Sequence, residues 1–259
     1  MARSLAALLL LLLSACATEP YDNTRGWSPD KIYNEAKAEL AAGNYKKAIA
    51  LYEKLQARHP YGRYAQQAEL EVAYAQFKDS EPVQALAAAD RFIKLHPEHP
   101  NVDYAYYLKG LINFNEDLGL IGGLFQNDLN DRDPKSAKES FEAFKEVVTR
   151  FPNSRYAGDA AARMTYIINS LAGGEVKIAQ YYLRREAYVA AVNRATYVLE
   201  NYPQSPAQEQ ALAIMVTAYD AMGLNDLGAT AQRLLDMNHP GSKVSVVAAK
   251  RERKWWHLW

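Results

Sequence analysis

The stretch LAAGNYKKAIALYEKL, residues 40–55, decides the fold because it holds the end of one helix, a turn and the start of a second helix. Gly43 marks the turn, since glycine commonly follows the last residue of a helix. After the turn, a small residue and then larger ones recur at helical spacing: Ala48, Ile49, Tyr52 and Leu55. We therefore predict a helical hairpin, in which Ala48 lets the two helices approach closely.

The same pattern precedes five prolines, Pro60, Pro97, Pro152, Pro203 and Pro240, which are separated by 37, 55, 51 and 37 residues. The positions 12, 11, 8 and 5 residues before the later prolines are Ala85/Leu86/Ala89/Phe92, Ser140/Phe141/Phe144/Val147, Ala191/Val192/Ala195/Val198 and Gly228/Ala229/Gln232/Leu235. This pattern resembles the second helix of a tetratricopeptide (TPR) repeat, ended by its proline. We predict an all-α fold: a superhelical solenoid of about five TPR-like hairpins, with about ten helices and no strands.

Capping residues precede proline at three expected helix starts: Ser28-Pro29, Asp133-Pro134 and Ser205-Pro206. Two segments break the repeat. Residues 116–134 lengthen the third repeat, and residues 172–186 insert a helix-like piece into the fourth. Insertions in a solenoid often map to one face, so both segments are candidate partner surfaces.

The N-terminus has the three regions of a secretory leader: Arg3, an apolar run over residues 5–13, and small residues before the only cysteine. Leu13-Ser14-Ala15-Cys16 resembles a bacterial lipobox. We expect residues 1–15 to be removed as a signal peptide and Cys16 to carry a diacylglycerol and an N-acyl chain; a free or buried thiol is the alternative. Ala17 and Thr18, in place of an aspartate after the cysteine, favour sorting to the outer membrane, on its periplasmic face.

Composition narrows the classes of function. A single cysteine allows no internal disulfide, so packing alone must stabilise the fold. The 30 basic and 30 acidic residues balance, which gives no indication of a nucleic-acid partner. A nucleophile elbow and a phosphate-binding loop are both missing from the sequence. We predict no enzyme activity, no metal and no cofactor beyond the acyl chains; a metal site at His96 and His99 is the weak alternative.

A solenoid of helical hairpins presents a concave face lined by the first helix of each repeat. Its expected lining is rich in tyrosine, with two lysines: Tyr33, Lys37, Gln67, Tyr74, Phe77, Lys78, Tyr104 and Tyr107. Tyrosine suits recognition of an aromatic chain end, and lysine suits a terminal carboxylate. We predict that this set binds client peptides; packing between helices is the alternative for each single ring.

Several stretches then resemble one family in order: GNYKKAI, YGRYAQQAEL, HPNVDYAYYLKG, NDRDPKSA, RFPNSRYAGDA and AQYYLRREAYVAAVNR. The chain resembles the BamD family of lipoproteins, a component of the β-barrel assembly machinery. The resemblance implies a scaffold in the periplasm that binds BamA, other Bam lipoproteins and unfolded outer-membrane proteins, and promotes their insertion. It implies client binding by residues 28–134, after a lipidated linker (16–27), and binding of a BamA POTRA domain by residues 135–240.

For the BamA contact, the resemblance points to Arg194 first and then to Tyr182, Arg184, Arg185 and Tyr188. A solvated or intramolecular ion pair is the alternative role for Arg194. Residues 241–259 form a basic tail with three tryptophans, suited to a membrane interface, a partner groove or a cap on the last helix. A different function on the same fold also stays open: an adaptor for periplasmic cell-wall hydrolases or proteases.

Overall fold

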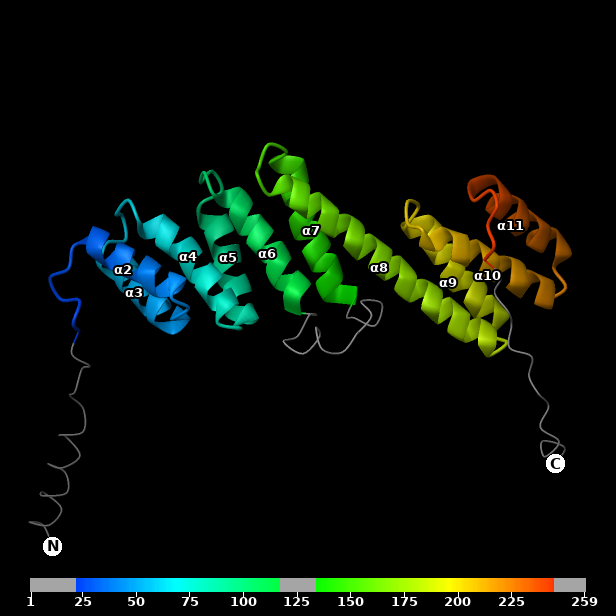
Figure 1. Cartoon of the computed structure of the whole chain (residues 1–259), viewed down its shortest axis with the longest axis horizontal. Coiled ribbons are helices and arrows are strands. Elements are labelled where there is room, and N and C mark those ends of the chain that lie inside the picture. The colour runs from blue at the N-terminus through cyan, green and yellow to red at the C-terminus, as the bar shows by residue number, and fades with distance from the viewer. Residues whose placement is uncertain (1–21, 117–133, 245–259) are drawn as a thin grey trace, which may run out of the picture. The chain divides into compact units, whose positions relative to one another are not determined.

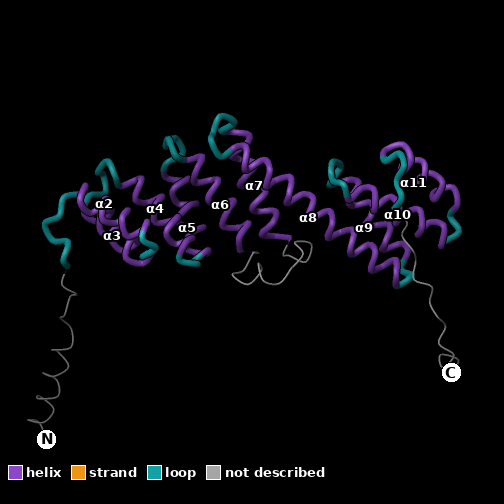
Figure 2. The backbone as a smooth tube through the Cα atoms, in the orientation of Figure 1, coloured by secondary structure: helices purple, strands orange, loops and turns teal. Residues whose placement is uncertain are grey.

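The computed structural model describes residues 22–116 and 134–244, and within them all regular structure is helical (Figures 1 and 2). The helices are α2 (Pro29–Ala41), α3 (Tyr45–Arg58), α4 (Ala65–Lys78), α5 (Pro82–Leu95), α6 (Val102–Glu116), α7 (Pro134–Arg150), α8 (Ala157–Arg184), α9 (Tyr188–Asn201), α10 (Ala207–Ala221) and α11 (Asn225–Asn238). These ten helices confirm the predicted all-α fold of helical hairpins. None of them combines the length and apolar character needed to cross a bilayer.

The chain divides into two compact units, residues 1–75 and residues 76–259. In the first, Ile32 and Ala36 of α2 pack against Ala48 and Tyr52 of α3 in one buried cluster. The second has a larger cluster that joins α8, α9 and α10 and a smaller one that joins α7 to the first half of α8. Apolar burial therefore holds each helix pair together, as expected of a chain without disulfides.

The repeat positions are buried as the pattern predicts. Ala48, Ala85, Ser140 and Ala191, which stand 12 residues before four of the prolines, have no exposed surface. The residues 8 and 5 positions before those prolines are buried as well. Only the fifth repeat departs, because Gln232 is exposed where the others bury a side chain. Its helix α11 is the last one described.

Four of the five prolines end their helices in the same way. The residues before four of them, His59, His96, Tyr202 and His239, share φ between −134° and −129° and ψ between 55° and 65°. Each still donates its N–H to the carbonyl oxygen four residues back. The ring of a following proline excludes the α region for these residues, so the helix stops there.

The turns inside the hairpins also repeat. Seventeen residues before four of the prolines stand Gly43, Ser80, Glu186 and Gly223, with φ of 80°, 62°, 59° and 74°. The turn expected at Gly43 is thus confirmed. Two hairpins place a side chain where the backbone favours glycine, at Ser80 and Glu186.

The helix-like insertion expected over residues 172–186 is helical through residue 184, where it continues α8 without a break, and its Ala172, Val176, Ala179 and Leu183 are buried in the core. One expectation needs correction. Helix α10 begins at Ala207 rather than Pro206, although the Ser205 hydroxyl still accepts a hydrogen bond from the Ala207 N–H (3.3 Å). The cap at Ser28 is confirmed, since its hydroxyl accepts from the Lys31 N–H. Cys16, residues 117–133 and the tryptophans of the tail lie outside the described residues.

Candidate functional site

In the first unit, the predicted client-binding residue Tyr33 forms a column of stacked side chains. Its ring stacks on Tyr64, with centroids 4.4 Å apart and planes within 9°. The guanidinium of Arg63 lies over the Tyr64 ring, with its carbon 4.5 Å from the ring centroid. Arg63 also pairs with Asp30, which accepts a hydrogen bond from the Tyr64 hydroxyl (2.8 Å). The column exposes a cation and aromatic edges, a combination that suits an aromatic or acidic chain end.

The polar contacts fix the charges of this column. The hydrogen bond to Asp30 raises the pKa of Tyr64, and the same bond, helped by Arg63, lowers the pKa of Asp30. Burial raises the pKa of Tyr33, with the nearby Glu71 carboxylate adding to it. Both phenols therefore stay neutral and Asp30 stays ionised at neutral pH.

The second unit contains a matching column. Tyr107 stacks on Tyr156, with centroids 4.7 Å apart and planes within 19°. The guanidinium carbon of Arg155 lies 4.7 Å from the Tyr156 ring centroid. The Tyr107 hydroxyl donates to Asp159 (2.7 Å), and the ring of Tyr104 packs on Tyr156 from the side (5.3 Å). Burial is the main cause that raises the pKa of Tyr107, and the bond to Asp159 adds to it.

The two columns occupy the same place in their repeats. Each uses a tyrosine from the first helix of one hairpin and an Arg-Tyr-Ala segment that leads into the next: residues 63–65 and 155–157. The sequence prediction found Tyr33 and Tyr107 but missed their partners Tyr64 and Tyr156. The repeated Arg-Tyr-Ala segment was the signal that marked them.

The other predicted client residues are placed as follows. Gln67 donates to Glu71 (2.8 Å), Tyr74 and Phe77 are half-buried, and Lys37 and Lys78 are exposed. The set divides between the two units at residue 75. Their arrangement along one trough therefore stays a prediction.

Among the predicted BamA-binding residues, Arg194 lies on α9 and pairs with Glu175 on α8 (3.1 Å). The Arg194 side chain is 45% exposed, so it remains within reach of a partner. Arg184 and Arg185 are exposed at the end of α8, where Arg185 approaches the ring of Tyr181 (5.9 Å). Tyr182 and Tyr188 instead pack against the core cluster of α8, α9 and α10.

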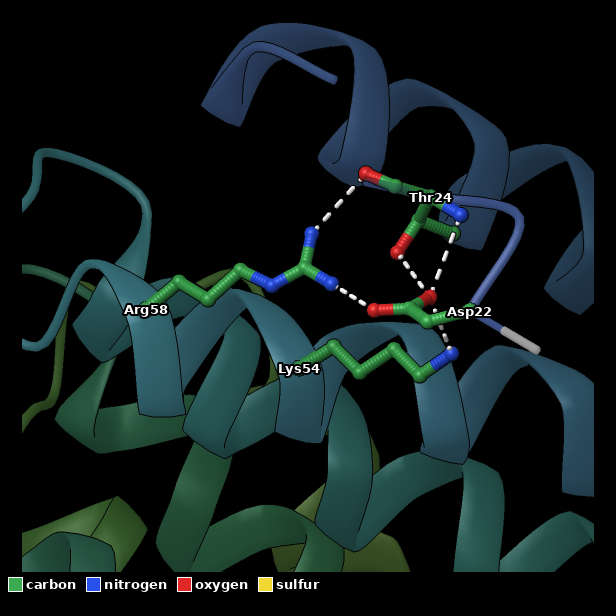
Figure 3. Close-up of polar contacts among 4 residues, drawn as sticks. All are labelled: Asp22, Thr24, Lys54 and Arg58. Carbon is green, nitrogen blue, oxygen red and sulfur yellow. Dashed lines mark hydrogen bonds and ion pairs between the residues drawn. The ribbon is translucent and has the colours of Figure 1, made fainter. Parts of the chain in front are cut away.

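A polar clasp ties the start of the described chain to α3 (Figure 3). Asp22 accepts hydrogen bonds from the Thr24 hydroxyl (2.7 Å) and from Lys54 (2.9 Å), and it pairs with Arg58. Arg58 also donates to the Thr24 carbonyl oxygen (2.9 Å). The bonds from Thr24 and Lys54 and the charge of Arg58 hold the pKa of Asp22 well below its ordinary value. We call these four residues the N-terminal clasp.

The alternative metal site at His96 and His99 receives no support from the loop geometry. Both rings pack against Phe92, at 5.2 and 5.1 Å. The Nδ1 atom of His99 accepts a hydrogen bond from the Asn101 N–H (3.1 Å), and burial lowers the pKa of His99. No group of three or more candidate ligand residues gathers in residues 22–116 or 134–244.

The repeated helical hairpins define a protein of the TPR-like helical-repeat class. Their second helices end before prolines, and aromatic and arginine side chains stack between successive hairpins. A family model described as "YfiO: Outer membrane lipoprotein" matches residues 26–234, and the chain belongs to this family. It is 45% identical to the "Outer membrane protein assembly factor BamD" of Neisseria meningitidis serogroup A, over 96% of each chain. It is 37% identical to the protein of that name in Vibrio cholerae, over 89% of this chain and 95% of the other.

A crystal structure of MamA protein also matches, with 14% identity and a TM-score of 0.39 over 85% of this chain and 97% of that one. The relatives confirm the resemblance to the BamD family that the sequence motifs indicated. The family description agrees with the expected place of the protein as an outer membrane lipoprotein. The names of the relatives support a role in outer-membrane protein assembly.

Proposed function

We propose that the protein is a lipid-anchored, non-catalytic scaffold that holds unfolded outer-membrane proteins and presents them to BamA. The observation that carries the client-binding part is the recurrence of the Arg-Tyr-Tyr column in two repeats. One column uses Tyr33, Tyr64 and Arg63, and the other uses Tyr107, Tyr156 and Arg155. Each column by itself offers stacked aromatic rings beside an arginine, which suits an aromatic side chain of an extended client segment.

The lipid anchor belongs to the same proposal. Acyl chains on Cys16 bury many methylene groups in the bilayer, at about 0.8 kcal/mol each, so two or more chains hold stably. The N-terminal clasp then sets the tether length. Asp22 is six residues from Cys16, and six residues span at most about 20 Å. If the clasp were open, α2 would be held only from Ser28, twelve residues away, and the reach would double to about 40 Å.

The contact with BamA is assigned to α8 and α9. Arg194 supports this assignment because a half-exposed guanidinium already oriented by Glu175 has donors left for a partner carboxylate. Arg184 lies nine residues beyond Glu175 on α8, about 14 Å along the helix axis. Arg184 and Arg194 thus offer separated cationic contacts to an acidic surface.

The client assignment is tested by replacing Tyr33 and Tyr107 with alanine in one variant. Binding of a peptide from the C-terminal strand of an outer-membrane barrel, followed by fluorescence titration, should weaken about tenfold, since aromatic pairs contribute about 0.5–1.5 kcal/mol each. Tyr61→Ala is the matched control because Tyr61 is fully exposed and stands two residues before Arg63 in the sequence. Equal affinity of the double variant and the control would refute client binding by the columns.

The whole proposal is tested by affinity purification of the lipidated protein from its own envelope. BamA and outer-membrane proteins should be recovered with the parent. Recovery of cell-wall hydrolases or proteases without BamA would instead establish the adaptor function.

A further inference from the structure

The arginine of the first column is neutralised within the chain. Arg63 forms an ion pair with the Asp30 carboxylate, which also accepts the hydrogen bond from the Tyr64 hydroxyl. Asp30 lies in the first turn of α2, three residues before the stacked ring of Tyr33. An acidic ligand at this column would have to compete with a carboxylate that is already in place.

The arginine of the second column has no such acid. Three residues before Tyr107 stands Tyr104, so a ring that packs on Tyr156 takes the position that Asp30 holds in the first column. Arg155 is exposed and donates a hydrogen bond to the Tyr156 hydroxyl. Among the residues that the structure describes, no carboxylate forms an ion pair with it.

Two acids beside the second column have partners of their own. Asp159 pairs with Arg163 (2.5 Å). Asp103 acts on Arg155 through its charge alone. The Asp103 carboxylate accepts hydrogen bonds from the Ser154 hydroxyl (2.6 Å) and from the next main-chain N–H (2.7 Å). Arg155 therefore keeps most of its five N–H donors for a carboxylate from another molecule.

Stacking holds the Arg155 guanidinium ready for such a ligand. Its carbon lies 4.7 Å from the centroid of the Tyr156 ring, so less side-chain freedom is lost when a ligand binds. The Tyr156 ring in turn stacks on Tyr107 (4.7 Å). A carboxylate bound by Arg155 would thus lie beside aromatic rings. A residue that carries both a carboxylate and an aromatic ring is an aromatic residue at the C-terminus of a chain.

We infer that Arg155 binds the terminal carboxylate of a client protein whose last residue is aromatic. The planar guanidinium can meet both carboxylate oxygens, while the aromatic side chain of the same client residue packs on the rings of the second column. The first column, whose arginine is already paired, binds aromatic side chains without regard to the chain end. This inference rests on the proposed client binding by the columns and adds which part of the client the second column recognises.

The test uses one acetylated peptide from the C-terminal strand of an outer-membrane barrel, ending in an aromatic residue, in two forms. One form has a free C-terminal carboxylate and the other a C-terminal amide. Fluorescence titration of the full mature chain should show about fivefold tighter binding of the free acid, the upper range for an exposed ion pair, and less at high salt. Equal binding of the two forms would overturn this inference and leave the proposed function intact. Binding of neither form would refute both.

Two pairs of variants assign the preference to Arg155. Arg155→Gln should make the two forms bind alike, whereas Arg233→Gln, which changes an exposed arginine on α11, should leave the preference unchanged. Tyr104→Asp gives the second column the acid that the first column has, so it should also abolish the preference. Tyr104→Asn, equal in size but uncharged, should retain it. The assignment is overturned if the preference survives Arg155→Gln or if the two Tyr104 variants behave alike.

Discussion

The hydroxyl of Ser140 on α7 donates a hydrogen bond to the carbonyl oxygen of Gly110 on α6, over 2.9 Å and with both residues buried. A backbone carbonyl inside a helix is within reach of a neighbouring helix only where the two backbones lie very close. Phe144 completes the contact, because its ring lies where a Cβ on Gly110 would stand, 2.5 to 2.9 Å away. The third hairpin therefore depends on two small residues at its crossing.

Gly110→Ala should lower the free energy of unfolding by about 1–3 kcal/mol, because the added methyl group overlaps the buried Phe144 ring. Urea denaturation followed by circular dichroism measures the change. Gly158→Ala is the matched control, since a Cβ there meets no atom within 4 Å and alanine is the better helix former, so stability should rise by roughly 0.5 kcal/mol. Equal effects of the two substitutions would show that α6 and α7 are not closely packed.

Glu186→Gly should stabilise the protein by about 0.5–1 kcal/mol, because Glu186 has a φ of 59° in the turn between α8 and α9. Gly223→Ala, at the equivalent turn with a φ of 74°, should destabilise it by a similar amount. Thermal unfolding of both variants measures the two changes in stability. Destabilisation by Glu186→Gly would mean that this side chain supports the turn in another way.

The roles of Arg194 are separated by exchanging the charges of its ion pair. Arg194→Glu should abolish copurification with BamA, and adding Glu175→Arg restores the ion pair between α8 and α9 with its charges reversed. If Arg194 meets a carboxylate of BamA, the double variant should remain defective. Recovery of BamA by the double variant would show that the intramolecular pair is the only requirement.

The N-terminal clasp should resist mild acid. Because folding lowers the pKa of Asp22, the stability that its ionised carboxylate gives to the clasp is complete above the ordinary carboxyl pKa of about 4. This stability is lost only as the pH falls through the lower pKa that Asp22 has in the folded protein. Hydrogen-exchange protection of the Trp27 N–H, which donates to the Thr24 carbonyl oxygen, should therefore be constant from neutral pH down to about pH 5.

Asp22→Asn removes the charge from the clasp, so it should lower that protection already at neutral pH. Glu53→Gln, which changes an exposed acid on the same helix α3, should have no effect. Equal protection in Asp22→Asn and in the parent would contradict the clasp.

Much of the fold was predictable because every hairpin needs a close helix crossing and a helix end, and these recur at a fixed spacing. The small residue 12 positions before each proline permits a close crossing, and the proline itself forbids further helix, so both leave marks in the sequence. The second half of α8 was expected to be helical but not to continue the first half without a break across Gly173 and Gly174. Yet Ala172, Val176 and Ala179 keep the spacing of one buried helix face across that pair.

The candidate site was only half predictable. Tyr33 and Tyr107 follow from helical spacing, whereas Tyr64 and Tyr156 stand in the segments between hairpins and reach them only in three dimensions. Arg194 could be named, but its pairing with Glu175 depends on how α8 and α9 cross. Asn113 of α6 is buried, and its side-chain amide has no hydrogen-bond partner among the described residues; no sequence pattern predicts this.

The length of α8 has a mechanical consequence. Its first half packs with α7 and its second half with α9 and α10, so one rigid rod is shared by two hydrophobic cores. The two clusters are thereby connected through the continuous backbone hydrogen bonds of α8. A pull or twist applied at α9 would travel along the rod to α7 without being absorbed by a hinge.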